Sequence, residues 1–191
     1  ELPVSELKVS EIRQTYYLDA PYFLYIGRVE TGKGCQSLID GFLEFKETTG
    51  SSQKLVLAGR VHMDRHKHED ILFTDFVPDN HIKPLIDGAT AIVVPSAFES
   101  LSILLLQAFL RRKPVVVNGL SPVLKEHCLI SNGGLFYQDQ DEMVACLDLI
   151  SQNSSLQKGL GENGFNYTAD HYNWKSVLDR FGRFCKSIVT H

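Results

Sequence analysis

Short apolar runs alternate along the chain with longer segments whose apolar residues recur at helical spacing. The short runs are rich in β-branched and aromatic residues and fit buried strands, which we expect at 22–26, 54–58, 71–74, 91–94, 115–117 and 134–137. The helical spacing predicts helices at 4–18, 79–88, 102–110, 141–150, 155–167 and 173–188, one more that begins after Gly34, and a short one between 118 and 133. Because strands and helices alternate over the whole length, the pattern predicts an α/β fold with a doubly wound, Rossmann-like parallel sheet.

Polar residues stand where several of these helices should begin. Ser5 fits as the cap of the first helix, and Asp79 fits as the cap of the helix that closes near Gly88. Ser100 and Ser102 both precede the apolar helix that runs to Leu110, and either could cap it.

The turn before that apolar helix holds one acid, Glu99. Pro95 stops the preceding strand, because proline cannot donate to a ladder. Free amides and the dipole at a helix start favour an anion, and we expect the amides of Leu101, Ser102 and Ile103 to be left to a ligand. Gln107 follows eight residues after Glu99, about two helical turns, and is expected on nearly the same side. From this stretch alone, an alternative to the ligand site is equally good: Glu99 is a solvated turn acid, and Gln107 is an ordinary polar residue on a core helix.

The loop after the first strand is rich in glycine and basic residues. Gly27 and Gly34 permit a tight turn and a close approach of the backbone, and Arg28 and Lys33 add two positive charges that suit a phosphate. The loop is neither a P-loop nor a GxGxxG loop, because Lys33 is followed by glycine. An ordinary loop with exposed cations is the alternative. Ligands of doubly wound sheets bind outside the carboxyl ends of the strands, where both loops should lie.

Composition narrows the class of protein. The chain has 191 residues, 43% of them hydrophobic, and a net charge of -4, so it lacks the basic signature of nucleic-acid binding. No apolar run approaches the roughly 20 residues of a membrane span, and the polar N-terminus does not indicate a signal peptide. None of the four cysteines forms a CxxC pair, so we expect reduced thiols and a cytoplasmic protein. The first residues look like a cut inside a longer protein.

Three other features are better explained by structure than by chemistry. His62, His66 and His68 share one polar loop that could hold a metal, but the loop offers no structured face and we expect it to be solvated. His127 and Cys128 are adjacent, and adjacent side chains rarely face each other, so we do not expect a catalytic pair. An apolar stripe near the C-terminus is expected to pack rather than to stack on bases; it contains Tyr172, Trp174, Val177, Leu178 and Phe181.

Taken together, the two loops resemble a known family. The chain is similar to the C-terminal, donor-binding domain of retaining GT-B glycosyltransferases of the group 1 type (glycosyltransferase family 4). The resemblance runs from about Phe23 to the last helix. It rests on Phe23-Leu24-Tyr25-Ile26-Gly27-Arg28, Lys33-Gly34, Leu57-Ala58-Gly59, Phe76-Val77-Pro78-Asp79, Ala91 through Glu99, Gln107-Ala108 and Lys113-Pro114-Val115-Val116-Val117.

The resemblance implies a role for each site residue. Arg28 and Lys33 would bind the donor diphosphate beside Gly27, and Glu99 would contact the transferred sugar. The amides of Leu101, Ser102 and Ile103 would meet the phosphates, and the backbone near Phe76 and Val77 would contact the base. Gln107 stands where the family has a glutamate that binds the ribose; its amide can bond a hydroxyl but lacks the charge. Family members work without a bound metal, so no metal or other cofactor is expected.

The resemblance also implies a division of the chain and a function. Residues 1–21 would be an interdomain helical extension, 22–170 the nucleotide-sugar binding domain of a GT-B fold, and 171–191 a helix that returns to a missing N-terminal domain. Part of the apolar stripe on that helix would then be left exposed here. The whole enzyme would move a hexose from a nucleotide-diphosphate sugar to a glycan, lipid-linked or small-molecule acceptor with retention, in glycan biosynthesis. The acceptor would bind the missing domain, so this chain should bind donor with little transfer, and a peripheral membrane location of the full-length protein stays open.

Two departures bear on the sugar pocket. Ser100 and Ser102 replace the family's usual glycines, and the usual Gly-Gly-x-x-Glu after the fifth strand reads Ser-Pro-Val-Leu-Lys at 121–125. The identity of the sugar is therefore open. A GT-B sugar epimerase, a non-catalytic nucleotide-sugar binding module and a ligand-free interaction domain are the alternatives.

Overall fold

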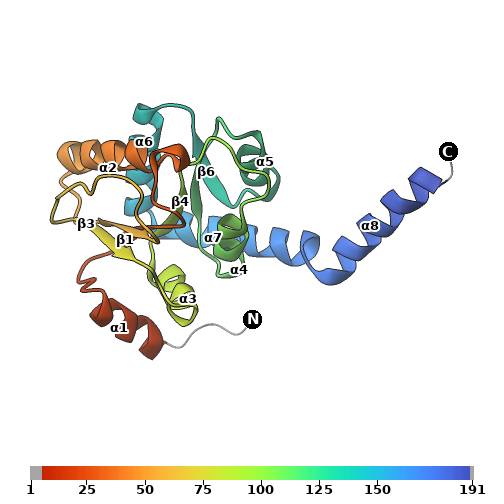
Figure 1. The fold of residues 1–191 in the computed structure, drawn as a ribbon, viewed down its shortest axis with the longest axis horizontal. Helices are drawn as coiled ribbons and strands as arrows, with labels where there is room; N and C mark the ends of the chain where they lie inside the picture. The colour runs from red at the N-terminus through yellow and green to blue at the C-terminus, as the bar shows by residue number, and fades with distance from the viewer. Residues whose placement is uncertain (1–5, 190–191) are drawn as a thin grey trace.

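The computed structural model describes residues 6–189 and forms one parallel sheet flanked by helices (Figure 1). The sheet has six strands in the order β3-β2-β1-β4-β5-β6, and every pairing is parallel. The strands are β1 Tyr22–Ile26, β2 Lys54–Ala58, β3 Ile71–Asp75, β4 Ala91–Val94, β5 Val115–Asn118 and β6 Gly134–Tyr137. The predicted doubly wound α/β fold is confirmed, with each strand within one residue of its expected bounds.

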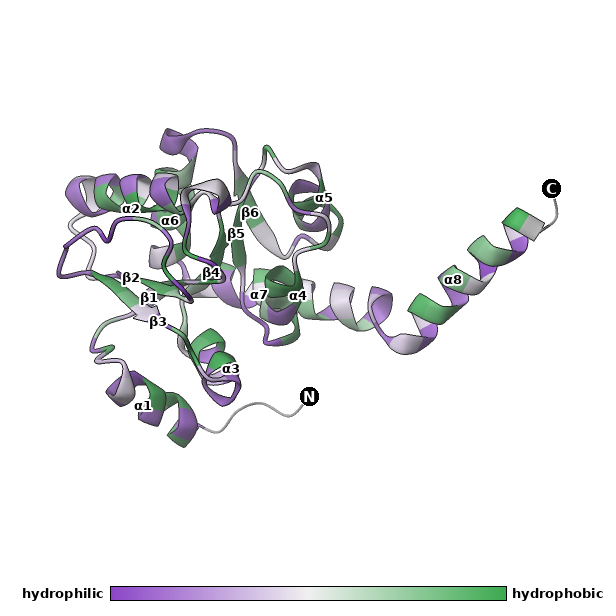
Figure 2. Ribbon diagram, in the orientation of Figure 1, coloured by the Kyte–Doolittle hydropathy of each residue, from purple (hydrophilic) through white to green (hydrophobic). Residues whose placement is uncertain are grey.

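Helices cover both faces of this sheet. They are α1 Glu6–Thr15, the short 3-10 helix η1 Thr31–Lys33, α2 Cys35–Thr49, α3 Asp79–Gly88, α4 Ile103–Leu110, α5 Pro122–Ser131, α6 Gln140–Gln152, α7 Ser154–His171 and α8 Trp174–Val189. Leu24 and its neighbours on one sheet face pack against α1, α3, α4 and α5. Phe23 and its neighbours on the other face pack against α2, α6 and α7. The inner strands β1, β2, β4 and β5 are mostly hydrophobic because both of their faces are buried, whereas the edge strands β3 and β6 are partly exposed (Figure 2).

The strand order reverses direction between β1 and β4. From β1 the chain builds outward through β2 to β3, and it then returns to place β4 on the other side of β1. Open α/β sheets bind ligands in the crevice at such a switch point, outside the carboxyl ends of the strands. The loop that follows β1 and the loop that follows β4 are the two that the sequence marked as chemically distinctive.

Some helix ends differ from the prediction. Pro78, not Asp79, is the N-cap of α3, and no side chain caps that helix. Asp79 lies in the first turn of α3, where a negative charge suits the helix dipole. Ser102 rather than Ser100 caps α4. The proposed capping role of Ser5 falls outside the described residues.

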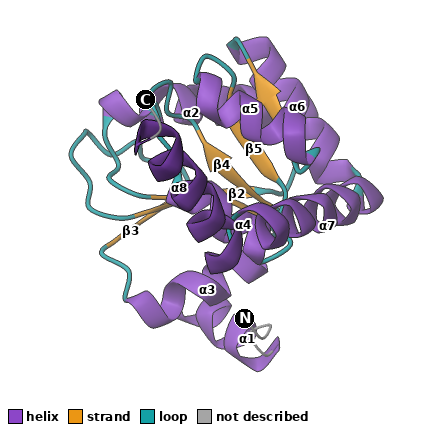
Figure 3. Ribbon diagram, turned by 90° about the vertical axis from the view of Figure 1, so that its right-hand side faces the viewer, coloured by secondary structure: helices purple, strands orange, loops and turns teal. Residues whose placement is uncertain are grey.

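Helix α8 extends away from the body of the domain (Figure 1), and in Figure 3, where this side faces the viewer, it lies in front of the other elements. No residue of α8 whose exposure is described is buried. Its large apolar side chains are exposed: Trp174, Leu178, Phe181, Phe184 and Ile188. Over α8 the stripe does not pack within this domain, in line with the expectation that part of it is left exposed here, whereas Tyr172, just before the helix, contacts other aromatic rings. Within the described part of the chain, no helix is both long enough and apolar enough to cross a membrane.

The four cysteines are free thiols, and two of them, Cys35 and Cys128, are buried. Burial raises the pKa of the Cys128 thiol to about 12 and that of Cys146 to about 11. Thiols with such raised pKa values are almost fully protonated at neutral pH and are poor nucleophiles. The expectation of reduced thiols is confirmed, and Cys128 is not an activated partner of His127.

Candidate functional site

The loops after β1 and β4 touch through their backbones. Gly34 has a φ of +75°, and a Cβ atom there would lie 2.3 Å from the carbonyl oxygen of Pro95. That spacing excludes any side chain at position 34 without movement of the β4 loop. On the other side, the side-chain amide of Asn118 donates to the same Pro95 carbonyl at 3.0 Å. The loop after β1, the loop after β4 and the end of β5 thus meet at the Pro95 carbonyl.

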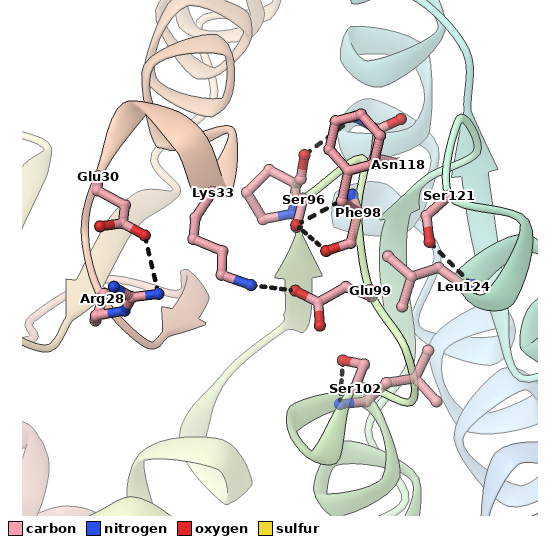
Figure 4. A network of polar contacts seen from close by, with 12 residues as sticks. Arg28, Glu30, Lys33, Ser96, Phe98, Glu99, Ser102, Asn118, Ser121 and Leu124 are labelled. Carbon is pink, nitrogen blue, oxygen red and sulfur yellow. Dashed lines mark hydrogen bonds and ion pairs between the residues drawn. The ribbon is translucent and has the colours of Figure 1, made fainter.

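A salt bridge joins the two loops. Lys33 Nζ donates to Glu99 Oε1 at 2.9 Å (Figure 4). The side chains are 31% and 19% exposed, so the pair is partly shielded but open to a ligand. The sequence predicted that Lys33 and Glu99 share a site, and the structure brings them into direct contact.

Arg28 lies in the same loop but is held differently. Its guanidinium pairs with Glu30 at 3.3 Å, and its side chain is 65% exposed. Seen from Glu99, Arg28 lies beyond Lys33 (Figure 4). The hydroxyl of Tyr25 donates to the Arg28 carbonyl at 2.8 Å and so fixes the backbone that carries this arginine. Glu30 was not predicted as a site residue; an acid two residues from an arginine in a short loop is the signal that could have found it.

The start of α4 faces this pair with an unusual backbone. Ser102 has a φ of +61° and a ψ of +85°, in the left-handed region that favours glycine. Its hydroxyl accepts a hydrogen bond from the amide of Leu105 at 3.4 Å. By helix geometry the first amides of α4 have no intrahelical acceptor, so those of Ile103 and Leu104 stay available at the positive end of the dipole. Leu101 and Ile103 are exposed and Ser102 is nearly buried.

Two further polar side chains shape the β4 loop. The hydroxyl of Ser96 donates to the Phe98 carbonyl at 3.0 Å and accepts from the Phe98 amide at 3.4 Å. This turn leaves the Phe98 ring 86% exposed and directs the chain toward Glu99 (Figure 4). Neither Ser96 nor Asn118 was predicted as a site residue. Their place at the end of a buried strand (Asn118) or two residues beyond one (Ser96) was the available signal.

The remaining predicted site residues lie just after β1, just after β3 and on α4. Gly27 donates its amide to Ala58 at 2.9 Å and continues the sheet by one bond. Phe76 follows β3 and is exposed, whereas Val77 beside it is buried. Gln107 is exposed on α4, one turn after Ile103. Because α4 begins at Ile103, the helical-spacing argument from Glu99 does not apply; Gln107 shares a face with Ile103 instead.

The histidine-rich loop begins next to the β1 loop. Val29 donates to the Arg60 carbonyl at 2.9 Å, and His62 donates its amide to the Val29 carbonyl at 2.8 Å. His62, His66 and His68 are all exposed, and His68 Nδ1 accepts from the amide of Asp70 at 3.1 Å. Over residues 6–189, no group of three or more histidines, cysteines or acids is arranged to hold a metal ion.

Comparison with known sequences gives one consistent answer. The family model described as "Glycosyl transferases group 1" matches residues 10–167. Alpha-D-kanosaminyltransferase from Streptomyces kanamyceticus is 25% identical over 198 residues, which cover 96% of this chain and 50% of that protein. Mannosylfructose-phosphate synthase from Agrobacterium fabrum is 24% identical over 131 residues, or 60% of this chain and 29% of that protein. The chain spans half or less of the length of these relatives.

Solved structures share the fold. Anabaena HepE in complex with UDP-glucose superposes with a TM-score of 0.80 at 14% identity, over 97% of this chain and 54% of that one. The C-terminal domain of the glycosyl transferase group 1 family protein LpcC from Francisella tularensis gives a TM-score of 0.73 at 16% identity, over 90% of this chain and 96% of that domain. The sheet and its helices thus form the C-terminal half of a GT-B fold.

Proposed function

The chain belongs to the glycosyl transferases group 1 family, and from that premise we propose that it is the donor-binding half of a retaining glycosyltransferase. The contact between Lys33 and Glu99 at the switch point carries the proposal, because it places a cation for the diphosphate beside an acid for the sugar. Residues 22–170 would bind the donor. Residues 1–21 and 171–191 would connect this domain to an N-terminal domain that completes the cleft.

The mechanism we propose is electrostatic. Negative charge develops on the leaving diphosphate as the glycosidic bond breaks. Lys33, Arg28 and the first amides of α4 would stabilise that charge, because they are already in place and need no reorganisation during the reaction. Glu99 would orient the sugar and oppose the positive charge that develops on its ring. No metal ion enters this scheme, since the two cations and the helix start act on the diphosphate.

Arg28 must reorient to take part. Its guanidinium is engaged by Glu30 at the rim of the loop. An exposed ion pair of this kind contributes little free energy, so a diphosphate can replace Glu30 at small cost. Arginine can then bind two phosphate oxygens at once, whereas Lys33 acts as a point charge.

The donor would be a nucleoside diphosphate hexose. The complex of Anabaena HepE with UDP-glucose supports this class of donor for a domain of the same fold. The base would lie near Phe76 and Val77, and Gln107 would bond a ribose hydroxyl as a neutral group. The glycan, lipid-linked or small-molecule acceptor would bind the N-terminal domain, so the 191-residue chain should bind donor and transfer little sugar. A cytoplasmic location remains part of this proposal.

Gln107 supports one alternative function. A neutral amide loses the charge-assisted bonds that a carboxylate would make to the ribose, which suits a nucleotide-sugar binding module without transfer activity. In that case the full-length protein would be inactive, and Gln107→Glu would restore transfer. If the full-length protein transfers sugar with Gln107 in place, the module is excluded.

A thermal-shift titration of the chain with UDP, GDP and ADP tests donor binding. A bound nucleotide raises the melting temperature further as its concentration increases. We expect Arg28→Glu to abolish the shift, because a negative charge at the loop repels the diphosphate. Arg112→Glu is the matched control: Arg112 lies two residues beyond Leu110, the last residue of α4, at the opposite end of the helix from its start, and it pairs with Glu162. Absence of a shift with all three nucleotides, or an unchanged shift in Arg28→Glu, would contradict the proposed site.

A further inference from the structure

The backbone carbonyl of Arg28 is held by two buried side chains. The Tyr25 hydroxyl on β1 donates to it at 2.8 Å, and the Cys35 thiol at the start of α2 donates to it at 3.9 Å. Tyr25 is 4% exposed and Cys35 is fully buried. Over residues 6–189, no backbone amide donates to this carbonyl. Side chains alone therefore determine where the Arg28 carbonyl points.

The peptide unit between Arg28 and Val29 is bonded on both sides. Its carbonyl accepts from the buried hydroxyl and thiol, and its amide, that of Val29, donates to the Arg60 carbonyl at 2.9 Å. The side chain of Arg28, by contrast, is 65% exposed. The backbone of this residue is thus anchored inside the fold while its guanidinium stays open to a ligand.

Burial keeps both side chains in the form that donates. It raises the pKa of the Tyr25 hydroxyl and that of the Cys35 thiol above their ordinary values, so both groups are protonated near pH 7. The hydroxyl is the stronger donor, because a thiol donates only weakly. A Cβ atom at Gly27 would lie 2.8 Å from the Tyr25 oxygen, so the glycine leaves the hydroxyl room to reach Arg28.

We propose that Tyr25 is a positioning residue of the donor site, assisted by Cys35, which fixes the backbone of Arg28 by holding its carbonyl. The inference rests on the proposed function, because it assigns Arg28 to the donor diphosphate. Neither Tyr25 nor Cys35 touches substrate in this scheme. The Arg28 guanidinium must leave Glu30 to bind a phosphate, and a backbone that is already fixed reduces what remains to be ordered when the ligand arrives.

Amide hydrogen exchange of the chain without nucleotide tests the positioning directly. Tyr25→Phe removes only the hydroxyl. We expect the amides of Gly27 and Val29 to exchange about fivefold faster in this variant, the factor that corresponds to the loss of one hydrogen bond. Cys35→Ala should give a smaller increase, because the thiol is the weaker donor. Cys35→Ser keeps a donor and should exchange as the wild type does.

Two variants remove the same kinds of bond elsewhere and serve as controls. Tyr22 lies three residues earlier on β1, packs on the other sheet face and donates its hydroxyl to the Leu85 carbonyl at 2.7 Å. The Cys128 thiol donates to the Leu135 carbonyl at 3.9 Å. Tyr22→Phe and Cys128→Ala should lower the melting temperature without a selective change at residues 27 and 29.

The comparison of the two tyrosines is decisive. If Tyr25→Phe changes the exchange of the Gly27 and Val29 amides no more than Tyr22→Phe does, Tyr25 is a core residue only and the inference fails.

Calorimetry measures the effect on the donor site. The ligand is whichever of UDP, GDP and ADP binds the wild type most tightly, and the temperature is one at which all variants are folded. We expect Tyr25→Phe to bind this nucleotide about three- to tenfold more weakly, with wild-type affinity in Tyr22→Phe. In an Arg28→Ala background, measured with millimolar nucleotide, Tyr25→Phe should cause no further loss, because Tyr25 acts through Arg28.

The outcomes separate this inference from the proposed function. Wild-type affinity in Tyr25→Phe, or an equal loss with and without the Arg28 guanidinium, would overturn the positioning role while the proposed function stands. If UDP, GDP and ADP all fail to bind the wild type, the proposed function is wrong and the donor-site role of Tyr25 is wrong with it.

Discussion

Lys33 and Glu99 are 66 residues apart in the sequence, and their charged atoms lie 2.9 Å apart. They come from the loops after β1 and β4, the two strands between which the sheet order reverses. The pair keeps the lysine ammonium and the glutamate carboxylate in place before any ligand arrives. Under the proposed function, a diphosphate would compete with Glu99 for Lys33.

Removing the charge of Glu99 should separate binding from catalysis. In Glu99→Gln, Lys33 loses its anionic partner, and the carboxylate no longer repels the phosphates. We expect UDP to bind about three- to tenfold more tightly by calorimetry. In the full-length enzyme the same change should lower the rate of transfer about a hundredfold or more, because the developing positive charge on the sugar is no longer opposed.

The control for this variant is Glu162→Gln. Glu162 pairs with Arg112 at 2.9 Å, and its side chain is 54% exposed, so its loss should leave UDP affinity unchanged. The unfolding free energy of Glu99→Gln should change by less than about 1 kcal/mol, because partly exposed ion pairs contribute little. Weaker binding of UDP to Glu99→Gln would contradict the proposed competition.

Ser102 should tolerate glycine better than alanine. Both changes remove the hydroxyl that caps Leu105. Alanine keeps the left-handed strain at a φ of +61°, so Ser102→Ala should lower the unfolding free energy by about 1 kcal/mol. Glycine relieves that strain, and Ser102→Gly should be within about 0.5 kcal/mol of wild type. Urea unfolding measures both values, and an alanine variant as stable as the glycine variant would refute the assignment of strain.

The apolar face of α8 should bind a hydrophobic dye. Leu178 and Phe181 are 58% and 64% exposed, so replacing both with serine should reduce the fluorescence of bound ANS to roughly half. The melting temperature should stay within about 2 °C, because neither side chain is buried. Leu7→Ser removes an exposed leucine from α1 and serves as the control. Equal dye binding in the double variant and this control would show that α8 is not the exposed apolar surface.

Protonation of His127 should destabilise the fold. Burial lowers the pKa of His127 below 6.5, and the Leu101 backbone and the charge of Glu126 only partly oppose this. The unfolded chain therefore binds a proton first as the pH falls. The contribution of neutral His127 to the unfolding free energy is fully present above about pH 6.5. It decreases as the pH drops toward the lowered pKa of the folded state.

Melting temperatures measured between about pH 7.5 and pH 5 test this effect. His127→Gln cannot bind the proton and should lose less stability over that interval than wild type. His66→Gln, in the exposed loop, is the control and should follow the wild-type curve. Parallel curves for His127→Gln and wild type would refute the contribution of His127.

The sequence predicted the strands and the two loops because hydrophobic periodicity and glycine placement are local signals. It also predicted that Lys33 and Glu99 share a site, since parallel strands bring their carboxyl ends to one edge of the sheet. The pairing of Arg28 with Glu30 was missed, because exposed ion pairs depend on side-chain rotamers rather than on pattern. The left-handed Ser102 was missed because serine gives no local signal for positive φ; only the family's glycine at that position did.

The local sequence pattern also could not predict the position of α8. Its apolar residues recur as they do in a helix that packs, and the sequence alone does not say whether the partner surface lies in this domain. The same limit applies to the N-cap of α3: Asp79 is a good capping residue, but the chain enters the helix one residue earlier, at Pro78. The contact between His127 and Tyr167 joins two helices, and no spacing rule predicts it.

The backbone contact between Gly34 and Pro95 has a consequence for engineering these two loops. A side chain at position 34, or a longer β4 turn, would push the two strand ends apart. A loop transplanted from a relative into this domain will therefore succeed only when its counterpart across the contact is transplanted with it. The loop that contains Gly34 and the loop that contains Pro95 must therefore be varied together. Libraries that randomise only one of these loops should consist mostly of misfolded variants.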